Sequence, residues 1–222
     1  MPFRPNAHQV FLTGATGYLG RTLSAELIER GHVVHGLTRA RSKGLLREGV
    51  MPVFGDALVA ASYVGSVPPA DTFVHLVGTR KPDPSKVSQF RSIDLASLDA
   101  AIAAAHTAGV KHLVYVSVAQ PAPVMRAYVE ARKAGESLIR ASGLNATILR
   151  PWYVLGPGRR WPVMLKPLYK LAAHVPSWRE PAQRLGLVTL EQMTAALVHA
   201  VENPAAGVRV VEVPTIRSPV PE

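Results

Sequence analysis

Tyr128 and Arg132 are the pair of side chains in this chain that is best suited to acid–base chemistry. They lie in a stretch, Ala127–Ser142, that has the pattern of a helix, and residues four apart on a helix share a face. The positive charge of Arg132 would favour the ionised form of the phenol, so the two side chains could serve together in proton transfer. Lys133 is a second candidate cation, although it points about 100° further round the helix. Glu136, four residues beyond Arg132, offers an alternative in which a surface ion pair occupies the arginine.

Three glycines, Gly14, Gly17 and Gly20, stand between an apolar run and a helical pattern. This context of strand, glycine turn and helix indicates a dinucleotide site. Gly14 permits the tight turn, Gly17 lets the backbone approach a pyrophosphate, and Gly20 lets helix and strand pack closely. The N–H groups at the start of the helix then hold the anion. A plain glycine turn is the simpler alternative. The residues expected to contact a cofactor here are Gly14, Thr16, Gly17, Tyr18, Leu19 and Gly20.

The end of the second predicted strand carries Arg39 and Arg41 and has no carboxylate nearby. An NAD site usually places Asp or Glu about 20 residues beyond the glycines, where it binds the ribose hydroxyls. A guanidinium at this place instead pairs well with the 2′-phosphate of NADP. The sequence therefore predicts that NADP(H) is preferred over NAD(H), with Arg39 as the phosphate-binding residue. The alternative is that both arginines are surface cations.

Apolar runs alternate with helical patterns along most of the chain, and most of the runs are apolar on both faces, as buried parallel strands are. This pattern predicts an α/β fold with a doubly wound parallel sheet, a Rossmann-type three-layer sandwich. We expect residues 1–222 to form one domain with a small C-terminal substrate-side extension, a lid or insert at residues 151–188. The expected strands are Gln9–Thr13, Val33–Thr38, Met51–Phe54, Thr72–Val77, His112–Ser117, Ala146–Arg150 and Val208–Val213, and the expected helices are Tyr18–Arg30, Arg91–Ala108, Ala127–Ser142 and Leu190–Glu202, the last with a capping box of Thr189 and Gln192.

The glycine segment, TGATGYLG in one-letter code, resembles the cofactor loop of the short-chain dehydrogenase/reductase superfamily, above all its extended and atypical branches, which are NmrA-like or NAD-dependent epimerase-like. The resemblance runs from about Val10 to Gly158 and includes the segment ASGLNATILRP that ends at Pro151. It implies that Tyr128 is the acid or base and that Ser117 orients a substrate carbonyl. The family has a lysine four residues beyond this tyrosine, where this chain has Arg132. The catalytic residues that the resemblance implies are thus Ser117, Tyr128 and either Arg132 or Lys133.

The resemblance also implies further contacts with a cofactor. Asp56, in a Gly-Asp pair, would contact the adenine, although it is equally suited to cap the following turn. Gly78 ends the fourth strand, where a small residue lets a cofactor lie against the backbone. The segment after the sixth strand would line the nicotinamide and substrate pocket. The residues implied are Asp56, Ala57, Leu76, Val77, Gly78, Pro151, Trp152, Tyr153 and Val154.

The composition narrows the classes of function. The chain has no cysteine, which excludes disulfides, thiolate catalysis and cysteine metal sites, and its eight histidines show no metal-binding spacing, so we expect no metal. The formal charge is +10, but the cations are scattered, which argues against specific nucleic-acid binding. No apolar run reaches the ~18–20 residues of a transmembrane segment. The N-terminus has no apolar signal region, which favours a cytoplasmic location.

The sequence predicts an NAD(P)(H)-binding oxidoreductase, in particular NADPH-dependent reduction of a small carbonyl or quinone-like compound. The departure at Arg132 leaves open a non-catalytic NADP(H)-binding sensor or accessory protein, in which Tyr128 only packs on the nicotinamide. A nucleotide-sugar epimerase or dehydratase is a third alternative, against which the short C-terminal part and the missing lysine count. The segment Trp161–Leu171 is expected to be a short packed helix, a lid over an apolar substrate or a membrane-surface segment. We expect a small-molecule substrate, and a homodimer is left open.

Overall fold

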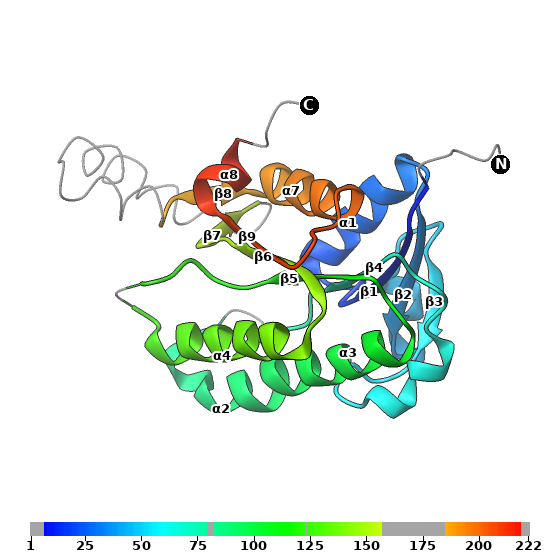
Figure 1. The fold of residues 1–222 in the computed structure, drawn as a ribbon, viewed down its shortest axis with the longest axis horizontal. Coiled ribbons are helices and arrows are strands. Elements are labelled where there is room, and N and C mark those ends of the chain that lie inside the picture. The colour runs from blue at the N-terminus through cyan, green and yellow to red at the C-terminus, as the bar shows by residue number, and fades with distance from the viewer. Residues whose placement is uncertain (1–6, 80–81, 123, 157–184, 219–222) are drawn as a thin grey trace.

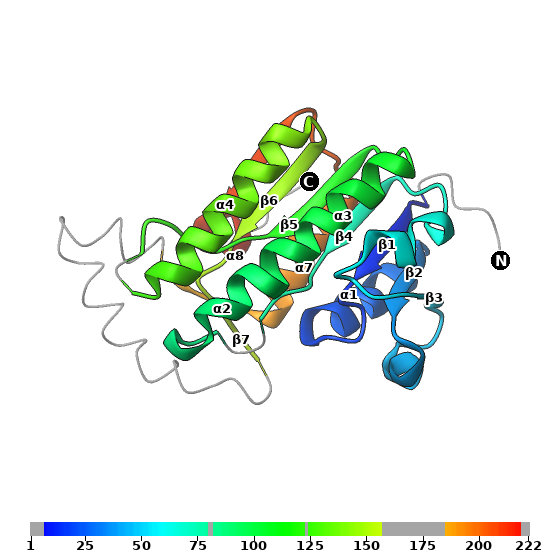
Figure 2. The same cartoon turned by 90° about the horizontal axis from the view of Figure 1, so that it is seen from below.

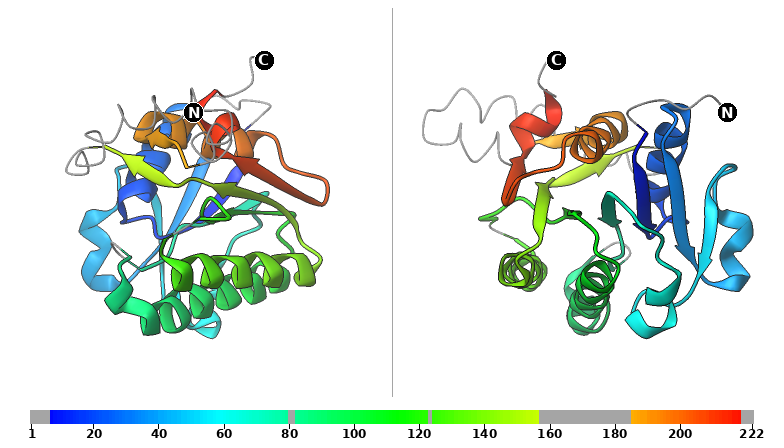
Figure 3. Two further views of the ribbon diagram at one scale, coloured as in Figure 1. Left: turned by 90° about the vertical axis from the view of Figure 1, so that its left-hand side faces the viewer. Right: turned by 45° about the vertical axis from the view of Figure 1, so that its right-hand side comes forward.

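The computed structural model describes residues 7–79, 82–122, 124–156 and 185–218. Its centre is a parallel sheet of seven strands in the order β3-β2-β1-β4-β5-β6-β9. These strands are β1 (Gln9–Thr13), β2 (Val33–Thr38), β3 (Met51–Phe54), β4 (Thr72–His75), β5 (His112–Val116), β6 (Asn145–Arg150) and β9 (Val208–Glu212). Helices cover both faces, as the two views of Figure 3 show, so the predicted Rossmann-type α/β fold is confirmed.

The helices form two layers, one on each side of the sheet (Figure 1). The first layer contains α1 (Tyr18–Glu29), α7 (Leu190–Glu202) and α8 (Val213–Arg217). The second layer contains α2 (Val87–Gln89), α3 (Ala96–Thr107) and α4 (Arg126–Ser142), with α4 alongside α2 and α3 in Figure 2. Short 3₁₀ turns occupy Ala40–Leu45, Ala60–Ser62, Val64–Ser66 and Pro84–Lys86. Within the described ranges, none of the helices has the length and apolar character needed to cross a bilayer.

Each layer packs against its own face of the sheet. The side of the hydrophobic core beneath the first layer, the first core, includes Val10 and Leu12 of β1 and Leu23 of α1. Phe11, between them, faces the opposite way and belongs to the second core, which lies beneath the second layer. There its ring lies 4.9 Å from that of Phe73, measured between centroids. Because side chains alternate between faces and both faces are covered, the strands read as continuous apolar runs in the sequence.

Strand β1 pairs with β2 on one side and with β4 on the other, so the direction of winding reverses between β1 and β4. In open α/β sheets, ligands bind at such a switch point, beyond the carboxyl ends of the strands. The glycine turn follows β1 at this edge, and Leu76–Gly78 follow β4 beside it. The topology thus brings two of the predicted cofactor segments together.

The structure differs from the predicted elements in the second layer. The helix expected at Arg91–Ala108 begins earlier, with α2, and passes through a π-helical segment at Phe90–Leu95 before α3. A pattern of period 3.6 does not reveal a wider π turn, which explains the error. At the other end of the fold, the predicted capping box of α7 is confirmed: the Thr189 hydroxyl accepts from the Gln192 N–H, and the Gln192 side chain accepts from the Thr189 N–H.

Two short strands were not predicted. β7 (Tyr153–Leu155) and β8 (Leu187–Thr189) pair in parallel as a separate small sheet. The predicted insert at 151–188 therefore has both of its ends in, or next to, this small sheet. Residues 157–184, with the segment Trp161–Leu171, lie outside the described residues.

Candidate functional site

The glycine turn after β1 has the geometry that the three glycines predict. Gly14 has φ +76°, and a Cβ on it would lie 2.9 Å from the carbonyl carbon of Leu76. A Cβ on Gly20 would clash with the carbonyl oxygen of Gly14. A side chain at either position would push the turn away from β4 or away from α1. The tight turn and the close helix packing predicted for Gly14 and Gly20 are therefore present.

The start of α1 fits an anionic group. Gly17 caps the helix without a side-chain hydrogen bond, and the first turn contains no acidic residue. The bond from the Arg21 N–H to the Gly17 carbonyl, at 3.0 Å, opens the helix, so the N–H groups of Tyr18, Leu19 and Gly20 precede the helical ladder. The N–H groups at the start of a helix and the positive end of the helix dipole together form a site that suits phosphate. The loop therefore suits the pyrophosphate of a dinucleotide.

A second group of contacting side chains surrounds Arg132, which lies on the face of α4 that packs toward the sheet. Its side chain is 8% exposed, and its Nη1 donates both to the hydroxyl of Tyr115 and to the carbonyl of Val116, each at 3.1 Å. Its Nη2 lies 2.7 Å from Oδ1 of Asp94, which is 1% exposed. Gly78 makes room for this arrangement, because a Cβ there would clash with the guanidinium.

Tyr128 and Arg132 contact one another as the helical spacing predicts. The Arg132 Nε donates to the Tyr128 hydroxyl oxygen at 3.2 Å, and the guanidinium carbon lies 5.1 Å from the centre of the Tyr128 ring. A guanidinium only donates hydrogen bonds, so the phenol oxygen is the acceptor and its own proton points elsewhere. The Tyr128 side chain is half-buried, and its ring meets that of Phe90 edge to face at 5.2 Å. Tyr128 is thus held by a cation at its hydroxyl and by the aromatic ring of Phe90.

The surroundings of Arg132 keep it charged. Burial lowers the pKa of Arg132, but Tyr115, Tyr128 and Asp94 together raise it by more, so its pKa lies above the ordinary value. Burial raises the pKa of Tyr115, which the charge of Arg132 opposes. The guanidinium is therefore a fixed positive charge and does not release a proton.

Glu136 does not pair with Arg132, and this alternative is wrong. Its carboxylate, 4% exposed, accepts from the guanidinium of Arg150 and from the hydroxyl of Ser117, the latter at 2.6 Å. Arg150 also contacts Glu212 at 2.8 Å, so the network joins α4 to the ends of β5, β6 and β9. The local rule for residues four apart holds for exposed helix surfaces. Here the helix face is buried, and partners from the sheet replace the neighbour on the helix.

Ser117 and Lys133 lie apart from the Tyr128–Arg132 contact. The Ser117 side chain is buried and donates to Glu136, so its hydroxyl proton is already engaged in a hydrogen bond. Lys133 is exposed and forms an ion pair with Glu130 at 2.9 Å. The structure thus places Arg132, and not Lys133, at the tyrosine hydroxyl.

The predicted adenine and phosphate contacts lie beyond β2 and β3. Arg39 is exposed and directly precedes the 3₁₀ turn Ala40–Leu45. Asp56 is exposed, and its carboxylate accepts from the Leu58 N–H at 3.0 Å. Asp56 therefore caps the following turn, which is the alternative that the sequence left open, while Ala57 is half-buried beside it.

The segment after β6 lies next to the glycine turn. The Pro151 carbonyl accepts from the Ala119 N–H at 3.0 Å, and Trp152 and Val154 pack against the first core. The hydroxyl of Tyr18 reaches the end of β7, where a Cβ on Gly156 would clash with it. The predicted cofactor residues at 14–20 and 151–154 therefore share one region.

Sequence reasoning gave three polar side chains of this region, those of Asp94, Tyr115 and Arg150, no role, and it offered Glu136 only as a surface partner of Arg132. Asp94, Tyr115, Glu136 and Arg150 are buried or partly buried and join in the two charged networks. One signal was available: an acidic residue at Asp94 and another at Glu136 fall on helix faces that carry mainly apolar or small residues toward the core. A charge on such a face needs a buried partner.

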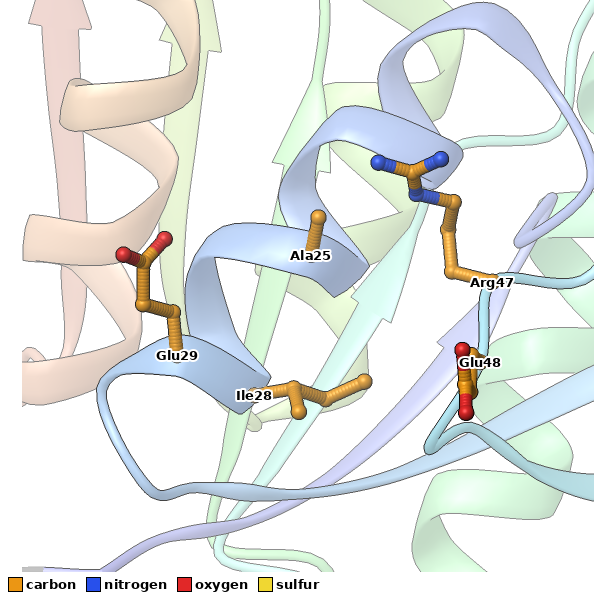
Figure 4. A pocket seen from close by; sticks show the side chains of 5 residues that line it. All are labelled: Ala25, Ile28, Glu29, Arg47 and Glu48. Carbon is orange, nitrogen blue, oxygen red and sulfur yellow. The ribbon is translucent and has the colours of Figure 1, made fainter.

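A separate hollow of about 330 Å³ lies between the end of α1 and the segment before β3 (Figure 4). It is lined by Ala25, Ile28, Glu29, Arg47 and Glu48. This is the edge at which the strands begin, opposite the glycine turn, so the hollow does not belong to the candidate site. Over the part of the chain that is described, no group of three histidine or acidic residues is arranged to hold a metal ion.

Comparison with known proteins identifies relatives of this chain. A family model described as NAD(P)H-binding matches residues 14–165. A ceramide reductase of Caulobacter vibrioides (strain NA1000 / CB15N) is 29% identical over 209 residues, which cover 89% of this chain and 62% of that protein. The photosystem II assembly factor Ycf39 of Cyanophora paradoxa is 28% identical over 148 residues, 64% of this chain and 44% of that protein. The chain thus spans less than two thirds of the length of these relatives.

Solved structures share the fold. The enzyme WbmH of Bordetella bronchiseptica, in complex with NAD⁺, superposes with a TM-score of 0.68 at 21% identity, covering 91% of this chain and 75% of that one. A UDP-galactose 4-epimerase superposes with a TM-score of 0.69 at 17% identity, covering 92% of this chain and 77% of that one. At these identities the likeness is one of fold.

Proposed function

The chain belongs to the NAD(P)H-binding family, and from this premise we propose that it is an NADPH-dependent oxidoreductase that reduces a small carbonyl or quinone-like compound. The observation that carries the proposal is the hydrogen bond from Arg132 to the Tyr128 hydroxyl. It leaves the phenol proton free to be donated and places a fixed positive charge where negative charge would develop.

The proposed roles follow from this geometry. Bound NADPH supplies a hydride for the carbonyl carbon. Tyr128 donates its proton to the carbonyl oxygen, and Arg132 stabilises the tyrosinate that remains. A proton from solvent then restores the phenol, because the charged guanidinium has none to give. Ser117 acts through Glu136, which it holds against Arg150, and so helps to fix the position of α4.

The cofactor would lie along the switch point between β1 and β4. The glycine turn and the start of α1 hold the pyrophosphate, and the backbone of Leu76–Gly78 lies beside them. Arg39, beyond β2, binds the 2′-phosphate and gives the preference for NADPH, while Asp56 and Ala57 flank the adenine. Trp152 and Tyr153 line the nicotinamide end.

The compounds to be tried as substrates follow from the proposed reaction and from one relative. One relative is named a ceramide reductase, which supports a reductase and adds ceramide to the carbonyl and quinone-like compounds that should be tried. The test is to follow NADPH oxidation with a panel of these compounds for the unaltered chain and for Tyr128→Phe. We expect the substitution to lower kcat about 100-fold or more. Lys133→Met, one position from Arg132, is the matched control and should keep full turnover. Equal turnover of the chain and Tyr128→Phe would contradict the proposal.

A second function has its own support. Asp94 partly offsets the charge of Arg132, and a guanidinium cannot pass on a proton as a lysine ammonium can. A chain that binds NADPH without turning it over, as a sensor or accessory protein, would keep both features. One relative is named an assembly factor, which is in line with this alternative. NADPH binding that persists alongside a failure to oxidise NADPH with any compound of the panel would favour it.

A further inference from the structure

We infer that Asp94 is a positioning residue that holds the Arg132 guanidinium against the Tyr128 hydroxyl and so sets the efficiency of proton donation by Tyr128. The inference rests on the proposed function. Neither the resemblance to known reductases nor the helical spacing of Tyr128 and Arg132 involves Asp94, which lies on a different helix of the second layer.

The Asp94 carboxylate is itself firmly anchored. Its Oδ2 accepts from the N–H of Thr79 at 2.9 Å and from the Thr79 hydroxyl, just beyond the end of β4. Its Oδ1 accepts no well-aligned hydrogen bond from the described residues, so the attraction to Arg132 Nη2 at 2.7 Å is mainly that of two opposite charges. One oxygen fixes the carboxylate to the loop that follows β4, and the other is left for the guanidinium.

Asp94 is also the one charged partner of Arg132 among the described residues. The other partners of the guanidinium are the hydroxyls of Tyr128 and Tyr115 and the carbonyl of Val116. A buried guanidinium without a counter-charge is strongly disfavoured and would turn toward solvent or draw in water. Without Asp94, Arg132 would therefore lose the orientation in which its Nε–H meets the Tyr128 oxygen.

The segment that carries Asp94 supports both members of the catalytic pair. It is the π-helical segment Phe90–Leu95, and Phe90, at its start, packs edge to face on the ring of Tyr128. Such π turns occur frequently at functional sites. One irregular segment thus holds the tyrosine through Phe90 and the arginine through Asp94.

A double-mutant cycle on turnover tests this role. We expect Asp94→Asn to lower kcat about 100-fold, with the KM for NADPH changed less than threefold, because the glycine turn is untouched. In the Arg132→Met background, Asp94→Asn should lower kcat less than twofold, since no guanidinium remains to be held. A loss of equal size in both backgrounds would overturn the inference, as would full activity of Asp94→Asn.

Folding of the variants is part of the same test. If Asp94→Asn alone fails to fold, the double variant should fold, because it removes the unpaired charge. A double variant that unfolds while Arg132→Met folds would show that Asp94 acts independently of Arg132, and would overturn the inference.

A second measurement separates this inference from the proposed function. In a ¹H–¹⁵N spectrum, the Nε–H of Arg132 should exchange slowly with water, and its signal is assigned by its loss in Arg132→Lys. Asp94→Asn should speed this exchange at least tenfold, whereas Asp99→Asn, at an exposed position of α3, should not change it. If the chain reduces no carbonyl but this result holds, the proposed function fails and the positioning stands. Unchanged exchange in Asp94→Asn would overturn the inference whether or not the chain is active.

Discussion

The Nε–H of Arg132 donates to the phenol oxygen of Tyr128 at 3.2 Å, across one turn of α4. In the family that this chain resembles, a lysine stands at that position. Both side chains bring a positive charge to the tyrosine, but Arg132 also contacts Tyr115 and Asp94, which fixes its place. The substitution therefore keeps the charge and exchanges a mobile ammonium for a rigid, permanently charged group.

Two substitutions of Arg132 distinguish the effect of its positive charge on kcat from the effect of its hydrogen bonds on stability. We expect Arg132→Met to lower kcat about 100-fold, because no charge then stabilises the tyrosinate. Arg132→Lys should keep at least a tenth of the activity but unfold more easily, by about 1–3 kcal/mol, since several hydrogen bonds are lost. Steady-state kinetics and denaturant unfolding give both quantities. If methionine and lysine reduce kcat equally, the charge is not what Tyr128 needs.

A side chain at Gly78 should disturb the same arginine. Its Cβ would clash with Arg132, which cannot swing away without breaking its contacts with Asp94 and Tyr115. We expect Gly78→Ala to destabilise the fold by about 1–3 kcal/mol and to lower kcat. The matched control is Gly65→Ala, where nothing lies within 4 Å of the new Cβ, and its effect should stay within about 0.5 kcal/mol. Equal stability of the two variants in urea would argue against the packed arrangement of Arg132.

Glu136 should matter to stability far more than its exposed neighbour Glu130. Glu136→Gln leaves the partly buried guanidinium of Arg150 with Glu212 and a weaker, neutral partner, and should lower the free energy of unfolding by about 1–3 kcal/mol. Glu130→Gln breaks only the exposed pair with Lys133 and should cost less than about 0.5 kcal/mol. Chemical denaturation of the two variants compares them directly. An equally small loss of unfolding free energy in both variants would mean that the contacts of Glu136 do not stabilise the fold.

Stability should fall with pH below about 6.5, because of two buried histidines. Burial, aided by the charge of Arg132, lowers the pKa of His75 to about 3, and burial with Arg209 lowers that of His112 to about 4. The unfolded chain therefore binds more protons between these values and 6.5, so the stabilisation is complete above 6.5 and is lost as the pH falls. Each histidine should add a slope of about 1.4 kcal/mol per pH unit.

Denaturant unfolding between pH 5 and 6.5 measures this slope. His75→Gln should reduce the slope by about the amount that one bound proton contributes. His106→Gln, at an exposed position, should leave the slope unchanged. A slope that is the same in His75→Gln as in the unaltered chain would show that His75 takes up no extra proton on unfolding.

Much of the fold follows from local signals. β1, β4 and β5 are recognisable because both faces of the sheet are covered, which leaves the central positions of each strand apolar. The glycine turn is recognisable because a Cβ on Gly14 or Gly20 would clash with the backbone, which restricts these positions to glycine. The capping box of α7 needs only Thr189 and Gln192, three residues apart. Signals confined to a few residues thus located these elements.

The buried ion pairs of the site could not be predicted from such local signals, because they join residues of different elements. The alternative pairing of Arg132 with Glu136 on one helix face does not form, because each finds a charged partner from elsewhere, Asp94 from the π-helical segment and Arg150 from β6. These pairings depend on how α4 packs against the sheet and against the neighbouring helix. No spacing within α4 encodes them.

The most direct test of the central claim, that this chain holds NADPH at the glycine turn, is a titration of the purified protein with NADPH and with NADH, followed by tryptophan fluorescence. We expect NADPH to bind at least about tenfold more tightly than NADH. Arg39→Gln should lose that preference, and Arg140→Gln, an exposed arginine at the far end of α4, should retain it. Binding of neither nucleotide would contradict the account, and tighter binding of NADH would contradict the role of Arg39.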